Sequence, residues 1–199
     1  TLAGILRELD PSAADGKGPA FPFAAGPIDR SHFVRHRELV RLLDAATSKT
    51  RVRPDRLEIE VRALELVGST IESAFARHGM PRRSRKGVES AHTERVEAAK
   101  EYLAGNLGRA VTLAYVARAA HASPFHLARL FQRRTGLPIH RYLVQLRLRA
   151  AVERLAGGER NLASLALNLG FASHSHFTDS FRREFGRTPS SFRSLKRAV

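Results

Sequence analysis

The chain has 199 residues and carries 34 Lys and Arg against 19 Asp and Glu, which gives a formal net charge of +15. A positive excess of this size favours a polyanionic partner, either nucleic acid or an anionic membrane surface. The sequence contains no cysteine, which excludes a disulfide framework, a thiolate nucleophile and a zinc finger built on cysteine. This composition fits a reducing cytoplasm.

No segment is typical of a signal peptide or a membrane span. Residues 1–9 carry both charge signs and lack a long apolar run. The longest uncharged stretch, residues 161–178, contains too much Asn, Ser and His to cross a bilayer. We therefore expect a cytoplasmic protein without membrane contact. Because the chain begins at Thr1 and not at a methionine, we also expect it to be the remainder of a longer protein.

The N-terminal part is predicted to contain a loop and two helices. Residues 11–27 are dense in Gly, Pro and Ala and favour a loop. Residues 31–46 predict a short amphipathic helix, and residues 54–78 a longer one with Pro54 in its first turn. The longer helix carries a heptad-like apolar stripe, interrupted at Gly68, that consists of Leu57, Val61, Leu64, Ile71 and Phe75. The pattern leaves open whether this stripe packs within its own domain or forms the seam of a homodimer.

A basic linker predicts a domain boundary after these helices. Gly79 ends the longer helix, and residues 81–87 read PRRSRKG. Residues 92–199 hold 18 Lys and Arg against 7 Asp and Glu, so the positive charge is concentrated in the C-terminal half. We predict an N-terminal tail over residues 1–80, a linker over 81–92 and a DNA-binding domain over 93–199, which we expect to fold and bind DNA alone.

The C-terminal half contains an internal repeat. Residues 113–117 (LAYVA) match residues 162–166 (LASLA) at an offset of 49. From the turn onward the matches continue at an offset of 50, with the pairs Ser123/Ser173, His126/His176, Phe131/Phe181, Arg133/Arg183 and Gly136/Gly186. The second copy therefore has one additional residue, which we place at its turn, at Gly170. An ordered set of this kind indicates two copies of one supersecondary unit.

Each copy is predicted to be a helix-turn-helix unit. Thr112 begins the first unit as an N-cap, and Ser123 and Ser173 are N-caps of the second helices. Gly136 and Gly186 end those helices, where a left-handed residue is needed. In this arrangement the second helix enters the major groove of DNA.

A helix over about residues 138–156 is predicted to join units that span 112–136 and 161–186. Its length of about 27 Å is comparable to one DNA turn of about 34 Å, so a single chain can present two recognition helices to successive major grooves. The predicted fold class is all-α: two helix-turn-helix units joined by a linker helix and preceded by helices from the tail of an N-terminal regulatory domain.

The apolar period of each second helix predicts which face is free to contact DNA. The inward residues are Leu127, Leu130 and Phe131 in the first helix and Phe177, Phe181 and Phe185 in the second. The outward residues predicted to contact DNA are Phe125, Arg129, Gln132, His174, Ser175, Thr178 and Arg182, with Asp179 among them. Such polar side chains suit base edges. One such face alone would be an ordinary solvated surface, but two matching faces in a basic domain favour DNA.

Residues 93–197 resemble the C-terminal domain of the AraC family of bacterial transcription regulators. The resemblance is strongest at residues 170–177 (GFASHSHF), residues 181–189 (FRREFGRTP) and Phe192-Arg193. It implies seven helices, the first over about 93–105 and the last opened by Thr188-Pro189. It also implies base contacts from Phe125, Arg129, His174, Ser175 and Thr178.

The resemblance bears on the partners as well. It implies double-stranded DNA as a partner, with RNA polymerase as a second candidate. Longer members of the family carry a small-molecule-sensing barrel, and residues 1–80 resemble only its tail because they contain too few strand-like runs. We therefore expect no effector pocket in this chain. Asp179 departs from the basic or polar residue of many relatives, and its carboxylate suits DNA only if it accepts from cytosine N4 or orients Arg182 or Arg183.

The predicted function is that of a sequence-specific DNA-binding transcription regulator, and the alternative is a non-specific architectural nucleic-acid-binding protein. We expect no enzyme activity, because a DNA-repair methyltransferase with a related regulator domain would need an acceptor cysteine. No cofactor or metal is expected either. The pairs His32/His36 and His174/His176 stand without a carboxylate cluster or cysteine nearby.

Overall fold

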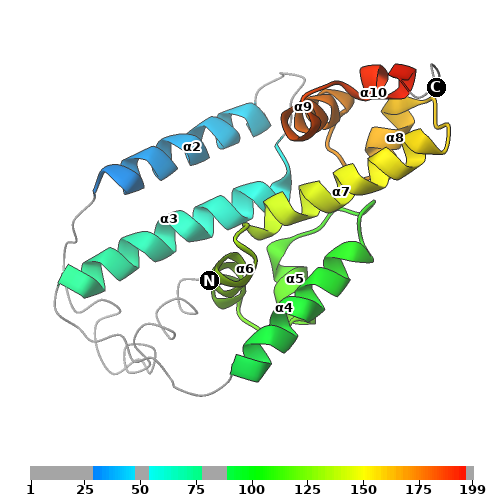
Figure 1. Cartoon of the computed structure of the whole chain (residues 1–199). Coiled ribbons are helices and arrows are strands. Elements are labelled where there is room, and N and C mark those ends of the chain that lie inside the picture. Colours follow the sequence, from blue (N-terminus) through cyan, green and yellow to red (C-terminus); the bar gives the residue numbers. More distant parts are fainter. Residues whose placement is uncertain (1–28, 48–53, 78–88, 196–199) are drawn as a thin grey trace.

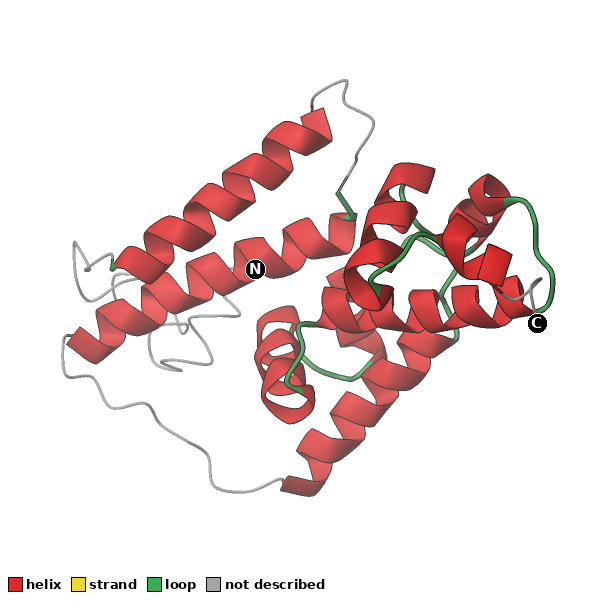
Figure 2. Cartoon of the chain, turned by 45° about the horizontal axis from the view of Figure 1, so that its top comes forward, coloured by secondary structure: helices red, strands yellow, loops and turns green. Residues whose placement is uncertain are grey.

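The computed structural model describes residues 29–47, 54–77 and 89–195, which form helices joined by short turns and contain no strand (Figures 1 and 2). The all-α prediction is confirmed for these residues. The helices are α2 (Arg30–Thr47), α3 (Arg56–Arg77), α4 (Glu89–Ala104), α5 (Leu113–Ala119), α6 (Pro124–Thr135), α7 (Ile139–Ala156), α8 (Leu162–Asn168), α9 (His174–Phe185) and α10 (Pro189–Leu195).

Helices α4 to α10 are the seven helices that the family resemblance implies. Helix α4 begins at Glu89, four residues before the expected start at Thr93. The predicted loop over residues 11–27 and the first part of the predicted linker, residues 81–88, lie outside the described residues. Among the described helices, none is both long and apolar enough to span a membrane.

Two hydrophobic cores lie along the continuous helix α7. The first core combines α4, α5, α6 and the start of α7, where Ile139 and Leu143 are buried. The second core combines α8, α9 and the end of α7, where Leu148 and Leu155 are buried. Helix α7 therefore supplies apolar side chains to both units, and Figure 1 shows it running from one unit to the other.

Helix α3 is part of the first core, which favours the intradomain interpretation of its apolar stripe. Leu57 and Val61 are fully buried among the core residues of the first unit. Ile71 and Phe75 are buried as well. The stripe is thus covered within the chain, and its geometry gives no support to a homodimer seam over residues 54–78. Helix α2 lies alongside α3 (Figure 1) and joins it through an ion pair of 3.1 Å between Glu38 Oε2 and Arg62 Nη1.

The predicted helix ends are confirmed at both recognition helices. Ser123 Oγ accepts a hydrogen bond from the backbone N of His126, and Ser173 Oγ accepts one from that of His176, each at 3.1 Å. Gly136 and Gly186 end these helices with φ of 74° and 72°. A residue with a side chain is strained at such angles, so glycine lets the chain leave both helices in the same direction.

The position of the inserted residue differs from the prediction. His121 has a φ of 48° in the first turn and Gly170 a φ of 76° in the second, so these residues are equivalent. The backbone N of Ala122 donates to the oxygen of Ala117, and that of Phe171 donates to Ala166 in the same way. The offset of 49 therefore extends through Phe171. The additional residue is Ala172, not Gly170, because it follows the last equivalent pair and precedes Ser173.

Candidate nucleic-acid interface

The outward face of α9 is accessible in this structure. His174, Asp179 and Arg182 are exposed, and Ser175 is half-buried. The hydroxyl of Thr178 is buried and finds no hydrogen-bond partner within the described part of the chain, which places it at the inner margin of this face. Phe177 and Phe181 point inward and are fully buried, as predicted. The face that periodicity assigns to DNA is thus open to solvent on α9.

The corresponding face of α6 is covered. The side chain of Phe125 is only 4% exposed, and its ring lies against Gly68 of α3 so closely that a Cβ atom at that glycine would overlap it. The prediction that Phe125 is exposed is wrong for this structure. Gln132 is exposed as predicted. Periodicity within α6 could not anticipate this difference, because the covering residue lies more than fifty positions earlier in the chain.

Arg129 is drawn into the same contact. Its guanidinium forms an ion pair with the carboxylate of Glu72 on α3, and it also lies 5.3 Å from the centre of the Phe125 ring. About a quarter of each ion-pair side chain is exposed. The arginine that we predict to read guanine on α6 is therefore engaged by a carboxylate of the chain itself.

Two further carboxylates near the start of α3 bind the DNA-binding half. Glu60 Oε2 accepts a hydrogen bond of 2.7 Å from the backbone N of Leu113, the first residue of α5. Asp55 Oδ2 lies 2.8 Å from Nη1 of Arg147 on α7. The start of α3 is thus held by polar contacts as well as by the first core.

Arg147 connects segments from both units. Its side chain is 1% exposed, and it donates to the backbone oxygens of Leu107 at 2.9 Å and Arg109 at 3.1 Å in addition to Asp55. Its guanidinium also packs against Gly170, where a Cβ atom would approach Nη2 to 2.7 Å. Burial lowers the pKa of Arg147, whereas the Asp55 carboxylate opposes that effect. Nothing in the residue pattern of the linker helix indicates that this arginine is buried.

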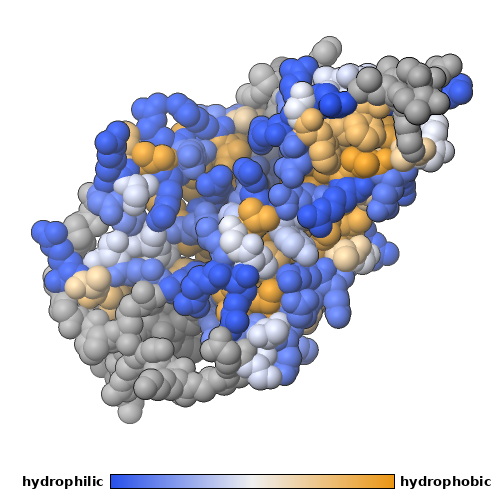
Figure 3. Space-filling view, viewed as in Figure 1, coloured by the Kyte–Doolittle hydropathy of each residue, from blue (hydrophilic) through white to orange (hydrophobic). Residues whose placement is uncertain are grey.

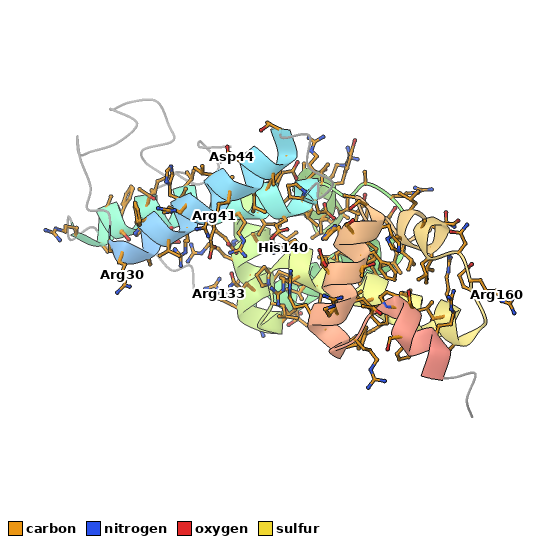
Figure 4. All side chains as sticks on the ribbon, turned by 90° about the horizontal axis from the view of Figure 1, so that it is seen from above. Arg30, Arg41, Asp44, Arg133, His140 and Arg160 are labelled. Atoms are coloured by element: carbon orange, nitrogen blue, oxygen red, sulfur yellow. The ribbon has the colours of Figure 1, made fainter. Side chains whose placement is uncertain are left out.

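His140 is the other buried base at the contact between α3 and α7. Its Nε2 lies 3.8 Å from Glu58 Oε1. Burial lowers the pKa of His140 to about 3, with further lowering by Arg62 and Arg141, and burial raises the pKa of Glu58. Figure 4 shows His140 inside the molecule, whereas Arg133 and Arg160 project from the surface. At neutral pH His140 is therefore uncharged.

The chemistry of the surface suits a polyanion better than a small substrate. Exposed arginines lie on or next to both recognition helices, namely Arg133, Arg182, Arg183 and Arg187. The face shown in Figure 3 is mainly hydrophilic, with an apolar area over the second unit. Among the described residues, no three His, Asp or Glu side chains are grouped so that they could hold a metal ion.

Comparison with known proteins assigns this arrangement to a family. A family model described as a helix-turn-helix domain matches residues 116–194. The regulatory protein SoxS of Salmonella typhimurium is 31% identical over 103 residues, which cover 52% of this chain and 96% of SoxS. The chain belongs to the AraC family of transcription regulators.

Two further proteins are similar to this AraC-family chain. The bifunctional transcriptional activator and DNA repair enzyme AdaA of Bacillus subtilis is 30% identical over 105 residues, which cover 53% of this chain and 50% of AdaA. The DNA-binding domain of AdpA, solved in complex with a target DNA, shares the fold with a TM-score of 0.50 at 23% identity and covers 53% of this chain and 95% of that domain. The chain spans half the length of AdaA and nearly all of SoxS.

The part of this AraC-family chain that covers α6 lies outside the family match. The match begins at Val116, so α2, α3 and α4 precede it. Sequence reasoning missed Gly68 and Glu72 as partners of the recognition helix. The one available signal was the glycine that interrupts the apolar stripe of α3, and the structure shows that the Phe125 ring occupies the space of the missing side chain.

Proposed function

We propose that this AraC-family chain regulates transcription by binding a specific DNA sequence, with α6 and α9 reading two successive major-groove segments. The observation that carries the proposal is the repetition of one helix-turn-helix geometry, with matching serine N-caps and glycine C-caps, in a strongly basic half-chain. A non-specific architectural protein would need the charge but not two helices presented in the same way.

The linker helix supports the proposed spacing. Helix α7 has 18 residues, which correspond to about 27 Å at 1.5 Å per residue. Because both cores include side chains of α7, the two units are fixed on one rod instead of being joined by a flexible tether. A rod of this length suits two contacts about one DNA turn apart, roughly 34 Å.

The proposed contacts keep the predicted residues. On α9 they are His174, Ser175, Thr178 and Arg182, and on α6 they are Phe125, Arg129 and Gln132. Arg182 and Arg129 suit guanine, and Gln132 suits adenine. Asp179 is exposed four residues before Arg183 and three before Arg182, so it is placed either to orient one of these arginines or to accept from cytosine N4.

The location, partners and activity that we assign to the protein follow from the same proposal. We place the protein in the cytoplasm, where a bacterial regulator meets DNA, with RNA polymerase as a candidate partner. AdaA is named as a DNA repair enzyme as well as an activator. This chain has no cysteine to accept an alkyl group, so we assign it regulation alone. The boundary between N-terminal tail and DNA-binding domain stays at residues 81–92 as a proposal, although α3 contributes to the core beyond it.

The test is a selection of bound duplexes from a random pool by the full chain, followed by titration of the selected and a scrambled duplex at several salt concentrations. We expect the selected duplex to bind at least a thousandfold more tightly, as specific regulators do. Equal affinity for both duplexes at every salt concentration would instead identify bulk electrostatic binding and overturn the proposal.

A further inference from the structure

The reading face of α6 and the second half of α3 compete for the same groups. Phe125 lies against the backbone at Gly68, and Arg129 is paired with Glu72. A base edge cannot reach Phe125 while its ring is packed against Gly68. The N–H groups of Arg129 that bind the Glu72 carboxylate cannot bind guanine at the same time. The two contacts with α3 and the proposed contacts with DNA therefore exclude each other.

Helix α3 is anchored unequally along its length. Its first half is held by the buried Leu57 and Val61 and, just before it, by the ion pair of Asp55 with Arg147. The second half buries Ile71, Ala74 and Phe75, but none of these belongs to the first core, and its ion pair with α6 is partly exposed. The first half of α3 thus belongs to the fold of the first unit, whereas the contact with α6 can be exchanged for another.

The residues near the start of the second half favour bending. Gly68 lowers the helix propensity there by about 1 kcal/mol relative to alanine. The hydroxyls of Ser69 and Thr70 both donate to the backbone oxygen of Leu66, at 3.0 and 2.8 Å, a local bond that competes with the helix ladder and often bends helices. The start of α2 can move with the second half, because His32 Nε2 lies 3.4 Å from Ser73 Oγ.

We propose that residues 65–77, the second half of α3, form an intramolecular lid that closes the first recognition helix, and that DNA binding by α6 requires this lid to leave. The inference rests on the proposed function, since it assigns regulation to the same DNA-reading face. The Glu72 carboxylate accepts from Arg129 and so substitutes for an acceptor on DNA. Gly68 has no side chain and therefore leaves room for the Phe125 ring. The open form binds DNA, so DNA itself shifts the population toward the open lid.

The lid makes α6 the regulated unit and α9 the constitutive one. Asp179 and Arg182 are exposed on α9, so the closed form keeps one reading face. It binds DNA through a single unit, with less sequence information than the open form. The apparent affinity of the whole chain is reduced by the fraction of molecules with an open lid.

The test compares three variants of the full chain on the duplex selected by the unmodified protein. Gly68→Ala adds a methyl group that overlaps the Phe125 ring while favouring the helix itself, and we expect about tenfold or more tighter binding. Glu72→Gln removes the ion pair, and we expect binding about two- to fivefold tighter. Asp44→Asn makes the same change of charge at an exposed position near the end of α2, outside the lid, so we expect less than about twofold change.

Hydrogen exchange with and without the selected duplex gives a second readout. Peptides within residues 65–77 should lose protection when DNA binds, whereas those within 56–64 should keep it. Circular dichroism of each variant checks that helix content is retained. If Glu72→Gln and Gly68→Ala are folded but bind the duplex no more tightly than Asp44→Asn, and the 65–77 peptides stay protected, the lid is rejected while sequence-specific binding stands. If no duplex is selected by the unmodified chain or by either lid variant, the proposed function fails as well.

Discussion

The two recognition helices are alike in how they are built and different in what lies over them. Helices α6 and α9 each have 12 residues, a serine N-cap and a left-handed glycine C-cap. On α6, Phe125 is buried beneath α3 and Arg129 is paired with it. On α9, the equivalent face is exposed. Repetition of a supersecondary unit therefore reproduces its fold, while its access to a partner depends on the elements around it.

The side chains on the two faces also differ at equivalent positions. At the offset of 50, Phe125 corresponds to Ser175, Arg129 to Asp179 and Gln132 to Arg182. A carboxylate such as Glu72 attracts Arg129 but would repel Asp179. An acidic lid of this kind suits α6 and not α9, which explains in charge terms why only one of the two faces is covered.

The largest effect on the free energy of unfolding is expected for the contact that holds the start of α3 to the first helix-turn-helix unit. Asp55→Ala leaves Arg147 buried without a carboxylate, and the loss of one partner of a buried pair costs about 3–5 kcal/mol. We expect the free energy of unfolding in urea to fall by this amount. Asp44→Ala, which removes an exposed carboxylate near the end of α2, should change it by less than about 0.5 kcal/mol. A loss below 1 kcal/mol for Asp55→Ala would show that the Asp55–Arg147 ion pair does not stabilise the attachment of α3 to this unit.

The comparison can be sharpened by the arginines of the two faces. Arg129→Ala and Arg182→Ala should each cost about 1–3 kcal/mol on the selected duplex and much less on a scrambled one. The loss for Arg129→Ala should be larger in the Glu72→Gln background, because in the unmodified chain this change also weakens the lid. The loss for Arg182→Ala should be the same in both backgrounds. Dependence of both losses on Glu72, or equal losses on both duplexes, would contradict this assignment.

Acidification should affect the covered unit through His140. The unfolded chain binds a proton at this histidine near pH 6.5, whereas the folded chain resists protonation until about pH 3. The free energy of unfolding therefore falls as the pH is lowered from 6.5, by about 1–2 kcal/mol at pH 5. The raised pKa of Glu58 works in the opposite direction. Urea unfolding of His140→Gln should show a flatter pH profile, and that of His36→Gln, exposed on α2, an unchanged one. An unchanged profile for His140→Gln would exclude this histidine as the cause.

The smallest effect is expected outside both reading faces. Arg193 on α10 donates to the backbone oxygen of Arg160 at 2.8 Å, and we assign it to phosphate contact with no base readout. Arg193→Ala should weaken the selected and the scrambled duplex alike and make the dependence of log affinity on log salt shallower by about one unit. A larger loss on the selected duplex would place Arg193 among the reading residues. We predict the same kind of phosphate contact for Arg197, which lies outside the described residues.

Local patterns predicted the fold well because local interactions determine it. The caps at Ser123, Ser173, Gly136 and Gly186 depend on neighbours within a few residues, and the structure confirms all four. The insertion was displaced by two residues because the identity of alanines at 122 and 172 suggested an equivalence that the backbone hydrogen bonds contradict. A glycine and a histidine share the left-handed position of the two turns, and sequence matching does not recognise that likeness.

The candidate site was predicted only in part because the missing half is non-local. The outward residues of α9 are where periodicity placed them. Phe125 obeys the same periodicity but meets Gly68, and nothing in the pattern of either helix says that they touch. Likewise, Arg147 follows the composition of an exposed linker helix, yet its partners lie in the turn between α4 and α5 and just before α3. The expectation that residues 93–199 suffice omitted these contacts.

Arg147 has a consequence for how the molecule melts. Two separate cores on one helix allow two separate thermal transitions. The buried guanidinium of Arg147 contacts Asp55, the turn at 107–109 and the turn at Gly170. The stability of each unit therefore depends on the other. Loss of the first core would remove the oxygen atoms that bind this charge, and loss of the second would remove the packing at Gly170 and Phe171 that covers it. Calorimetry should therefore record one endotherm whose van't Hoff and calorimetric enthalpies agree. The two helix-turn-helix units therefore unfold as one cooperative unit.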